Sequence, residues 1–189
     1  MFANHRFPWE FMMTRLFPAI AMAALSLLPA TSLAQTSANP LTDSVKAQLA
    51  MVKDSIVRTA AKVPEDLYAF KPTPDVRSLG ALIGHIADGN FSICGAAGGE
   101  AAPQVSIEKT KTSKADLTKA LADSFAFCDK VMAGMDDKKG LEITKFFTGA
   151  SPRVMVLAFN NSHCNEHYGN LVTYMRIKGI VPPSSEPAK

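Results

Sequence analysis

Two of the four histidines in this 189-residue chain, His163 and His167, are four residues apart. Successive residues of an α-helix turn by about 100°, so this spacing places the two imidazoles about 40° apart on one face. Two histidines one helical turn apart can chelate a metal ion. They can also form a hydrogen-bonded pair in a protein core, where an unpartnered imidazole nitrogen costs about 1–3 kcal/mol. The pair alone leaves both interpretations open.

The helix that carries this pair directs it toward the protein interior. The stripe with the histidines also contains four other residues: Val156, Asn160, Asn170 and Tyr174. Because Val156 is apolar, and because Phe159 and Leu171 flank the stripe, we expect both imidazoles to face the core. Asn170 and Tyr174 would then line any pocket beside them, although a core tyrosine with a satisfied hydroxyl is the more common outcome.

A third histidine, His85, lies on a face of mostly small residues in another predicted helix. This face contains Ser78, Ala81, Leu82, Gly89, Ser92 and Ala96. Small side chains leave space in front of an imidazole, whereas an ordinary packed face would carry Leu or Ile. We therefore expect His85 to look across at His163 and His167, although a histidine on the helix surface is the alternative. Three neutral imidazoles with an open position are typical of catalytic rather than structural zinc sites.

Two carboxylates lie near these histidines in the sequence. Asp88 is about one helical turn from His85, and Glu166 precedes His167 but points about 80° from the centre of the histidine pair. Each could act as a general base. A solvent-facing charge or a hydrogen bond to a metal ligand fits either position at least as well. No catalytic residue is therefore assigned from the sequence.

The chain contains three cysteines, Cys94, Cys128 and Cys164, which allow one disulfide and leave at least one thiol unpaired. The spacing does not decide which two would pair, and it does not resemble that of a zinc-binding cysteine pair. Cys94 lies about 180° from His85 on its helix, and Cys164 lies about 80° from the centre of the histidine pair. Neither is expected to bind a metal ion.

Four amphipathic stretches must position these residues. They run from Leu41 to the break at Val63–Pro64, from Ser78 to Gly98–Gly99, from Ser113 to Met132 or Met135, and from Ser151 to Gly179. Ser78, Ser113 and Ser151 are the expected N-caps, and Pro152 is expected at the first position of the last helix. No segment shows a convincing strand alternation, so the sequence predicts an all-α fold, a four-helix bundle. The second and third connections are long enough to run back along a helix, so a simple up-and-down order is not required.

The first 34 residues have the order of an export signal. Arg15 precedes an apolar run from Leu16 to Leu28, and the small residues Ser32 and Ala34 stand before Gln35. This order predicts a signal peptide that is cleaved after Ala34, whereas an uncleaved membrane anchor is the alternative. The expected organisation is residues 1–34 for an N-terminal extension and signal peptide, 35–185 for the helical domain and 186–189 for a tail. The mature protein would be periplasmic or secreted, with no stable membrane anchor after cleavage.

The charge balance argues against a nucleic-acid partner. Removal of the first 34 residues takes away Arg6, Arg15 and Glu10, which leaves 18 basic and 16 acidic residues of the 20 and 17 in the whole chain. Nucleic-acid-binding domains carry a marked basic excess instead. A small-molecule substrate is the expected partner, and a homodimer is compatible with the sequence.

Two long stretches closely resemble the DinB-like family of metal-binding four-helix bundles. They are VPEDLYAFKPTPDVRSLGALIGHIADGNFSIC, which ends at Cys94, and HCNEHYGNLVTYMRIKGIVPPSS, which begins at His163. The resemblance extends over roughly residues 41–185. It implies an up-down-down-up bundle with a long crossover connection, and a divalent metal ion bound by His85, His163 and His167. Three imidazoles suit zinc, nickel, copper or iron about equally well.

Relatives in this superfamily transfer low-molecular-weight thiols or isomerise small acids. The resemblance therefore implies a metalloenzyme, either a metal-dependent hydrolase or a small-thiol transferase, that activates water or a small thiol or acid substrate. Export would place this chain away from the usual cytosolic thiol pool. The first alternative is a non-catalytic helical bundle that binds a metal ion or a small ligand, and a weaker one is an interaction module whose histidines only pack.

Overall fold

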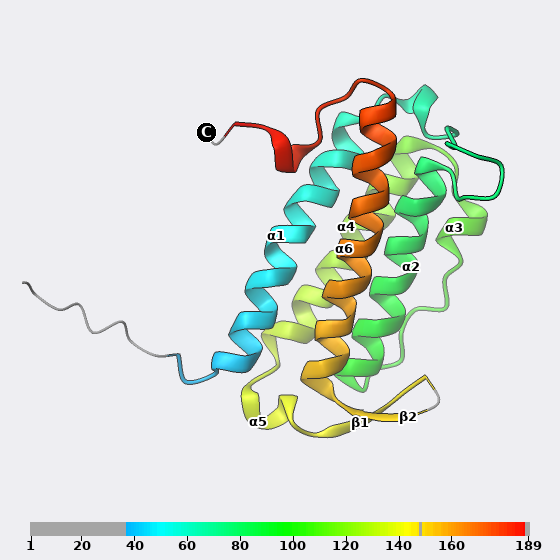
Figure 1. The fold of residues 1–189 in the computed structure, drawn as a ribbon. Coiled ribbons are helices and arrows are strands. Elements are labelled where there is room, and N and C mark those ends of the chain that lie inside the picture. The colour runs from blue at the N-terminus through cyan, green and yellow to red at the C-terminus, as the bar shows by residue number, and fades with distance from the viewer. Residues whose placement is uncertain (1–36, 148, 188–189) are drawn as a thin grey trace, which may run out of the picture. The chain divides into compact units, whose positions relative to one another are not determined.

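The computed structural model describes residues 37–147 and 149–187 (Figure 1). The predicted signal peptide and its cleavage site lie outside these residues. Four long helices provide the framework: α1 (Pro40–Lys62), α2 (Leu79–Gly98), α4 (Lys114–Ala133) and α6 (Arg153–Ile177). The shorter elements are η1 (Glu65–Leu67), α3 (Ile107–Thr110), α5 (Asp137–Gly140), β1 (Ile143–Phe146), β2 (Gly149–Pro152) and η2 (Pro183–Ser185). The described part of the chain is thus mainly helical, as the sequence predicts.

The long helices enclose one hydrophobic core. Helix α2 packs against α4 and α6, and α1 packs against the same two helices. Figure 1 shows α1 and α6 beginning at one end of this body and α2 and α4 beginning at the other. Fully buried side chains from all four helices meet in the core, among them Ile56, Ile83, Phe125 and Leu171. Burial of each such side chain contributes about 1.5–3 kcal/mol. Between residues 37 and 187, no described helix has the length and hydropathy that a membrane span requires.

The helix ends follow the predicted capping residues at two positions. Ser78 Oγ accepts a hydrogen bond from the amide of Ala81 (3.1 Å), and Ser113 Oγ accepts one from the amide of Asp116 (3.1 Å). Each cap satisfies an amide that has no partner within the helix, which is worth about 0.5–2 kcal/mol. Gly99 ends α2 with φ at 71°, a left-handed conformation that glycine adopts without steric cost.

The start of the last helix differs from the prediction. Residues 143–146 pair antiparallel with residues 149–152, and Thr144 lies opposite Ser151, so Ser151 is a strand residue and not a cap. Helix α6 begins at Arg153, whose amide donates to the carbonyl of Glu142 (2.9 Å). The strands have only four residues each, which is too short for alternation to stand out in the sequence. Proline at position 152 still precedes the helix, but as its N-cap.

A disulfide joins α2 to α4. Cys94 and Cys128 form it, 34 residues apart in the sequence and with a Cα–Cα distance of 5.3 Å. Closing a loop of this length in the unfolded chain stabilises the fold by about 3–4 kcal/mol. Cys164 is the remaining cysteine, and its thiol is free and buried.

Candidate metal centre

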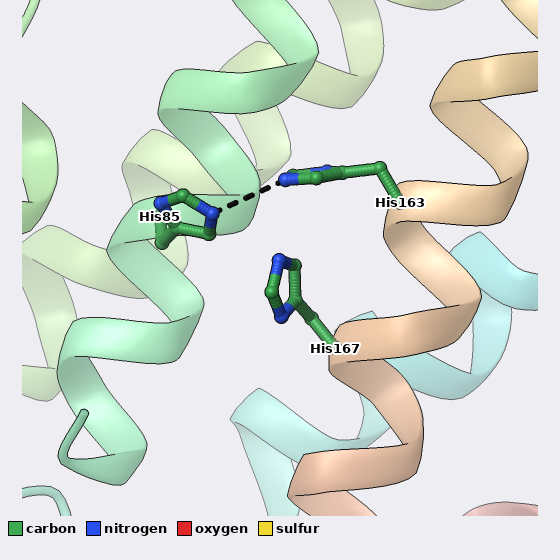
Figure 2. A group of neighbouring side chains, drawn as sticks. All are labelled: His85, His163 and His167. Atoms are coloured by element: carbon green, nitrogen blue, oxygen red, sulfur yellow. Dashed lines mark hydrogen bonds between the residues drawn. The ribbon is translucent and has the colours of Figure 1, made fainter. Parts of the chain in front are cut away.

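The three predicted ligand residues converge in the structure. His85 projects from α2, and His163 and His167 project from α6 toward it (Figure 2). One nitrogen from each ring lies within 4.8 Å of a nitrogen of both others. The closest pair is His163 Nε2 and His85 Nε2, which are 3.2 Å apart. His167 is only 6% exposed, and the other two rings are half-buried.

The spacing of the closest two nitrogens fits a shared metal ion. Zinc–nitrogen bonds are about 2.0–2.1 Å long, so two nitrogens on one tetrahedral ion are about 3.3–3.4 Å apart. The observed 3.2 Å between His163 Nε2 and His85 Nε2 is close to that value. Among the described residues, the group of His, Cys, Asp and Glu side chains that meets here consists of these three histidines alone. Within residues 37–147 and 149–187, this group thus offers three imidazoles without a fourth ligand of these types.

Gly89 makes room for this arrangement. A Cβ at this position of α2 would lie only 2.4 Å from Cε1 of His163. No side chain can occupy that space without moving the ring. A small residue on the face of α2 that carries His85 thus accommodates the imidazole of His163 from α6. This contact explains why that face of α2 carries small residues.

Glu108 orients His85, and the sequence analysis did not identify it. Its Oε2 lies 3.0 Å from His85 Nδ1, and its Oε1 accepts a hydrogen bond from Arg77 Nε (2.9 Å). An ionised carboxylate can only accept, so Nδ1 of His85 carries the proton. In the neutral ring Nε2 then keeps its lone pair, and that atom faces His163. This contact is typical of the carboxylates that hold metal-binding histidines in place.

Asp88 positions Glu108 and does not touch the histidines through any recorded hydrogen bond. Its carboxylate accepts from the amides of Ile107 (2.8 Å) and Glu108 (3.0 Å), at the start of the short helix α3. Gly84 allows this helix to approach α2, because a Cβ there would lie 2.8 Å from Glu108 Cα. Asp88 thus holds the start of α3 in place, and with it the Glu108 that contacts His85.

A cavity of about 750 Å³ opens beside the centre. It is bounded by His167, Glu166, Asn170, Tyr174, Arg77 and Lys71, among others. Asn170 and Tyr174 thus line a pocket, as their place on the helix predicts. Tyr174 donates its hydroxyl hydrogen to the carbonyl of Arg77 (3.0 Å), and Asn170 Nδ2 lies 3.4 Å from His167 Nδ1. The cavity brings solvent or a small molecule to one side of the histidines.

Comparison with known proteins places the chain in a family. A family model described as the DinB superfamily matches residues 48–171, about two thirds of the sequence. The chain belongs to the DinB superfamily. The match contains all three histidines of the centre. No curated protein sequence matches the chain.

Solved structures of DinB-like proteins share the fold. One from Bacillus cereus is 18% identical, with a TM-score of 0.65, and the alignment covers 75% of this chain and 95% of that one. One from Bacillus subtilis is 16% identical, with a TM-score of 0.62, and the alignment covers 77% of this chain and 99% of that one. A conserved protein from Enterococcus faecalis is 15% identical, with a TM-score of 0.61, and the alignment covers 72% of this chain and 95% of that one. At these identities the likeness supports the DinB-like fold and nothing finer.

Burial lowers the pKa of two histidines in this DinB superfamily centre. Burial lowers the pKa of His163 to about 4, and the nearby His167, His85 and Arg77 act in the same direction. Burial also lowers the pKa of His167, with a further contribution from His85. The pKa of Glu108 is lowered as well: burial opposes its ionisation, but hydrogen bonds from Arg77 and His85 outweigh that effect. Near neutral pH the centre therefore combines unprotonated His163 and His167 rings with an ionised Glu108 carboxylate.

The cysteines of this DinB superfamily member stay apart from the centre. Cys94 is committed to the disulfide, so its sulfur is not a thiolate ligand. Cys164 is fully buried and donates to Asn90 Oδ1 (3.4 Å), and burial raises the pKa of its thiol to about 12. A thiol with such a pKa is almost never ionised near neutral pH, so it is a poor metal ligand.

Proposed function

We propose that this DinB superfamily chain binds a divalent metal ion through His85, His163 and His167 and acts as an exported metalloenzyme on a small molecule. The observation that carries the proposal is the convergence of three imidazoles, one of them oriented by a carboxylate, beside a cavity. Zinc, nickel or iron suits such ligands.

Each residue of the centre has a definable task. A divalent ion bound there would supply Lewis acidity, which lowers the pKa of water or of a small thiol and yields a nucleophile near neutral pH. His85 presents Nε2 because Glu108 holds the proton on Nδ1. Arg77 balances the charge of that carboxylate and lines the cavity, where a small thiol or acid substrate would bind.

A non-catalytic metal or small-ligand carrier is the second candidate. The observation in its favour is that the carboxylate which contacts the centre in the described part of the chain, Glu108, is already engaged by His85 and Arg77. Asp88 is engaged by the amides of α3. Glu166 lines the cavity and is the remaining carboxylate that the sequence analysis considered. A Glu166→Gln variant separates the two functions: loss of turnover with retained metal supports the enzyme.

Export is supported by the disulfide and by the N-terminal sequence. Disulfides persist in oxidising compartments and are rare in the cytosol. We expect cleavage between Ala34 and Gln35, and a periplasmic or secreted mature protein. Mass spectrometry of the protein recovered from its native host checks this, and an intact chain in the membrane fraction would contradict it.

We also propose the up-down-down-up order for the four long helices, which makes the fold a four-helix bundle. The supporting observation is that α2 and α4 begin at the same end, so the connection at residues 99–113 has to return along the body (Figure 1). Such a connection is the long crossover expected from the sequence, and it carries α3 with Glu108.

The decisive experiment is elemental analysis of untagged protein after loading with zinc, nickel or iron. About one equivalent of metal per chain is expected, together with a melting temperature that a chelator lowers. Protein that holds no stoichiometric metal and melts identically with and without chelator would remove the basis for both candidate functions.

A further inference from the structure

Large apolar side chains are exposed at the end of the body where α1 begins. Leu41, Leu141, Ile143 and Phe147 are between 50% and 70% exposed. They come from the first turn of α1, the segment after α5, and the β1–β2 hairpin, which lie at the same end (Figure 1). Hydrogen bonds from the amides of Leu41 and Thr42 to Asp137 join the first turn of α1 to α5, the helix that directly precedes Leu141.

The tip of the hairpin holds Phe147 in an unusual conformation. Its φ is 49°, in the left-handed region that bulky residues rarely enter. Its ring contacts those of Phe146, at a centroid distance of 4.2 Å, and Phe159, at 5.7 Å. These contacts fix the tip on α6 while 70% of Phe147 stays exposed. Backbone strain of this kind persists where the surroundings enforce it, often at functional surfaces.

The same end presents unpaired positive charge. Lys138 and Lys145 are exposed, and neither ammonium has a hydrogen-bond or ion-pair partner within residues 37–147 and 149–187. The nearby carboxylates of Asp136, Asp137 and Glu142 are all engaged, by amides or by Arg153. On β1, alternate residues are exposed, so Ile143 and Lys145 share the outward face. An apolar and a basic group thus stand together there.

We propose that this end docks reversibly on the surface of a bilayer that contains anionic phospholipid. Aromatic and aliphatic side chains enter the boundary between headgroups and acyl chains, while lysines are attracted to the phosphates. A second copy of the chain fits less well, because a two-fold contact through this surface would place Lys138 and Lys145 of both copies in one interface. The cavity beside the histidines is lined by residues 71–78, near the opposite end, so docking leaves it accessible (Figure 1).

A single tryptophan can report on this contact. Trp9 is the only tryptophan of the chain, so the form that begins at Gln35 contains none. That form includes the whole compact unit that starts at Ser37. In a Phe147→Trp variant, vesicles of equal parts phosphatidylglycerol and phosphatidylcholine should shift the emission to the blue, and brominated acyl chains should quench it. Vesicles of phosphatidylcholine alone should have little effect.

Two matched variants sharpen the test. Met51→Trp, at a position on α1 that is 67% exposed, should show no shift. Replacing Lys138 and Lys145 by glutamine in the Phe147→Trp protein should weaken vesicle affinity about fivefold for each lysine lost. Metal content of each sample verifies that the fold is intact and keeps this test separate from the proposed metal function.

Three outcomes would overturn the proposal. The first is an unchanged emission with both vesicle types. The second is an equal shift with phosphatidylcholine alone, which would remove the role of anionic lipid. The third is a blue shift that grows with protein concentration in the absence of vesicles, which would identify a second copy of the chain as the occupant.

Discussion

Helices α2 and α6 bring polar residues together at two neighbouring levels of the interior. One level is the histidine centre. The other, about one helical turn away, contains Asn90, Asn160 and Cys164, which are fully buried. There, Asn160 Nδ2 donates to Asn90 Oδ1 (3.0 Å), and Asn90 Nδ2 donates to Ser124 Oγ (3.1 Å). The series ends on the backbone, where Ser124 donates to the carbonyl of Leu121 (2.8 Å).

The two levels differ in how their polar atoms are satisfied. The asparagine level has one acceptor without a partner, Asn160 Oδ1, and its other side-chain amide atoms bond within the protein. The histidine centre brings several nitrogens with lone pairs toward one point and holds one ring by an outside carboxylate. Neutral imidazoles cannot all satisfy one another in that geometry, because each carries only one proton. Most polar atoms of the asparagine level are therefore satisfied within the protein. The histidine centre instead directs nitrogens toward a common point, as a site for a ligand would.

Alanine substitution should separate the two levels most clearly. His85→Ala, His163→Ala or His167→Ala removes one of three ligands, so metal affinity should fall by far more than the roughly 10–100-fold typical of an outer-contact loss. Asn160→Ala should instead lower the free energy of unfolding by about 1–3 kcal/mol and leave metal affinity unchanged. Competition with a chelator and urea unfolding provide the two measurements. An equal loss of metal affinity in Asn160→Ala would erase the distinction.

The space that Gly89 leaves for His163 provides the next test. In Gly89→Ala the new methyl group would lie 2.4 Å from the ring, which must then move. We expect a loss of metal affinity near the upper end of the 10–100-fold range. Gly169→Ala on α6 is the matched control, because nothing lies within 4 Å of its added carbon. That change should raise stability by up to about 1 kcal/mol through helix propensity and leave metal affinity unaltered.

The inward-facing positions of the histidines could be predicted from the sequence because the placement of a side chain on a helix is a local property. Helical periodicity puts His163 and His167 on one inward face, and the small residues around His85 mark the opposing face. The caps at Ser78 and Ser113 follow from equally local hydrogen bonds. Resemblance to the DinB-like family pointed to the same three residues.

The remaining features depend on contacts between distant segments. Glu108 reaches His85 only because Asp88, about 20 residues earlier, binds the amides of α3. Ser151 does not cap α6, because it pairs with Thr144 in the β1–β2 hairpin. Helical or strand periodicity in the sequence does not reveal this pairing. The pairing of Cys94 with Cys128 required knowledge of which helices are neighbours. Each of these was beyond the reach of spacing along one helix.

Removal of the Glu108 charge should have a smaller effect than displacement of a ligand. In Glu108→Gln the side-chain oxygen can still accept from His85 Nδ1, but it no longer carries the negative charge that raises the basicity of the ring. We expect metal affinity to fall about tenfold, at the lower end of the range for such contacts. Glu100→Gln, which affects only a surface ion pair with Lys130, is the control and should leave affinity unchanged. A loss as large as that of a histidine variant would show that Glu108 itself binds the metal.

The smallest expected difference between the two levels lies in how the free energy of unfolding of the metal-free protein depends on pH. The pKa of His163 is about 4 in the folded protein, below the ordinary value of 6.5, chiefly because of burial. Between these values the unfolded chain binds a proton that the folded chain does not, so the free energy of unfolding should fall as the pH drops from about 6.5 to 4. The lowered pKa of His167 acts in the same direction.

Urea unfolding of metal-free protein across this pH range measures the slope. His163→Gln should reduce the slope, because glutamine does not titrate. Asn160→Ala should lower the free energy of unfolding at every pH and leave the slope unchanged. Carboxylates that titrate near the acid end contribute equally to all three proteins, so the difference between the curves isolates His163. An unchanged slope in His163→Gln would mean that this imidazole titrates normally in the folded state, and the view that burial keeps the centre unprotonated would then have to be abandoned.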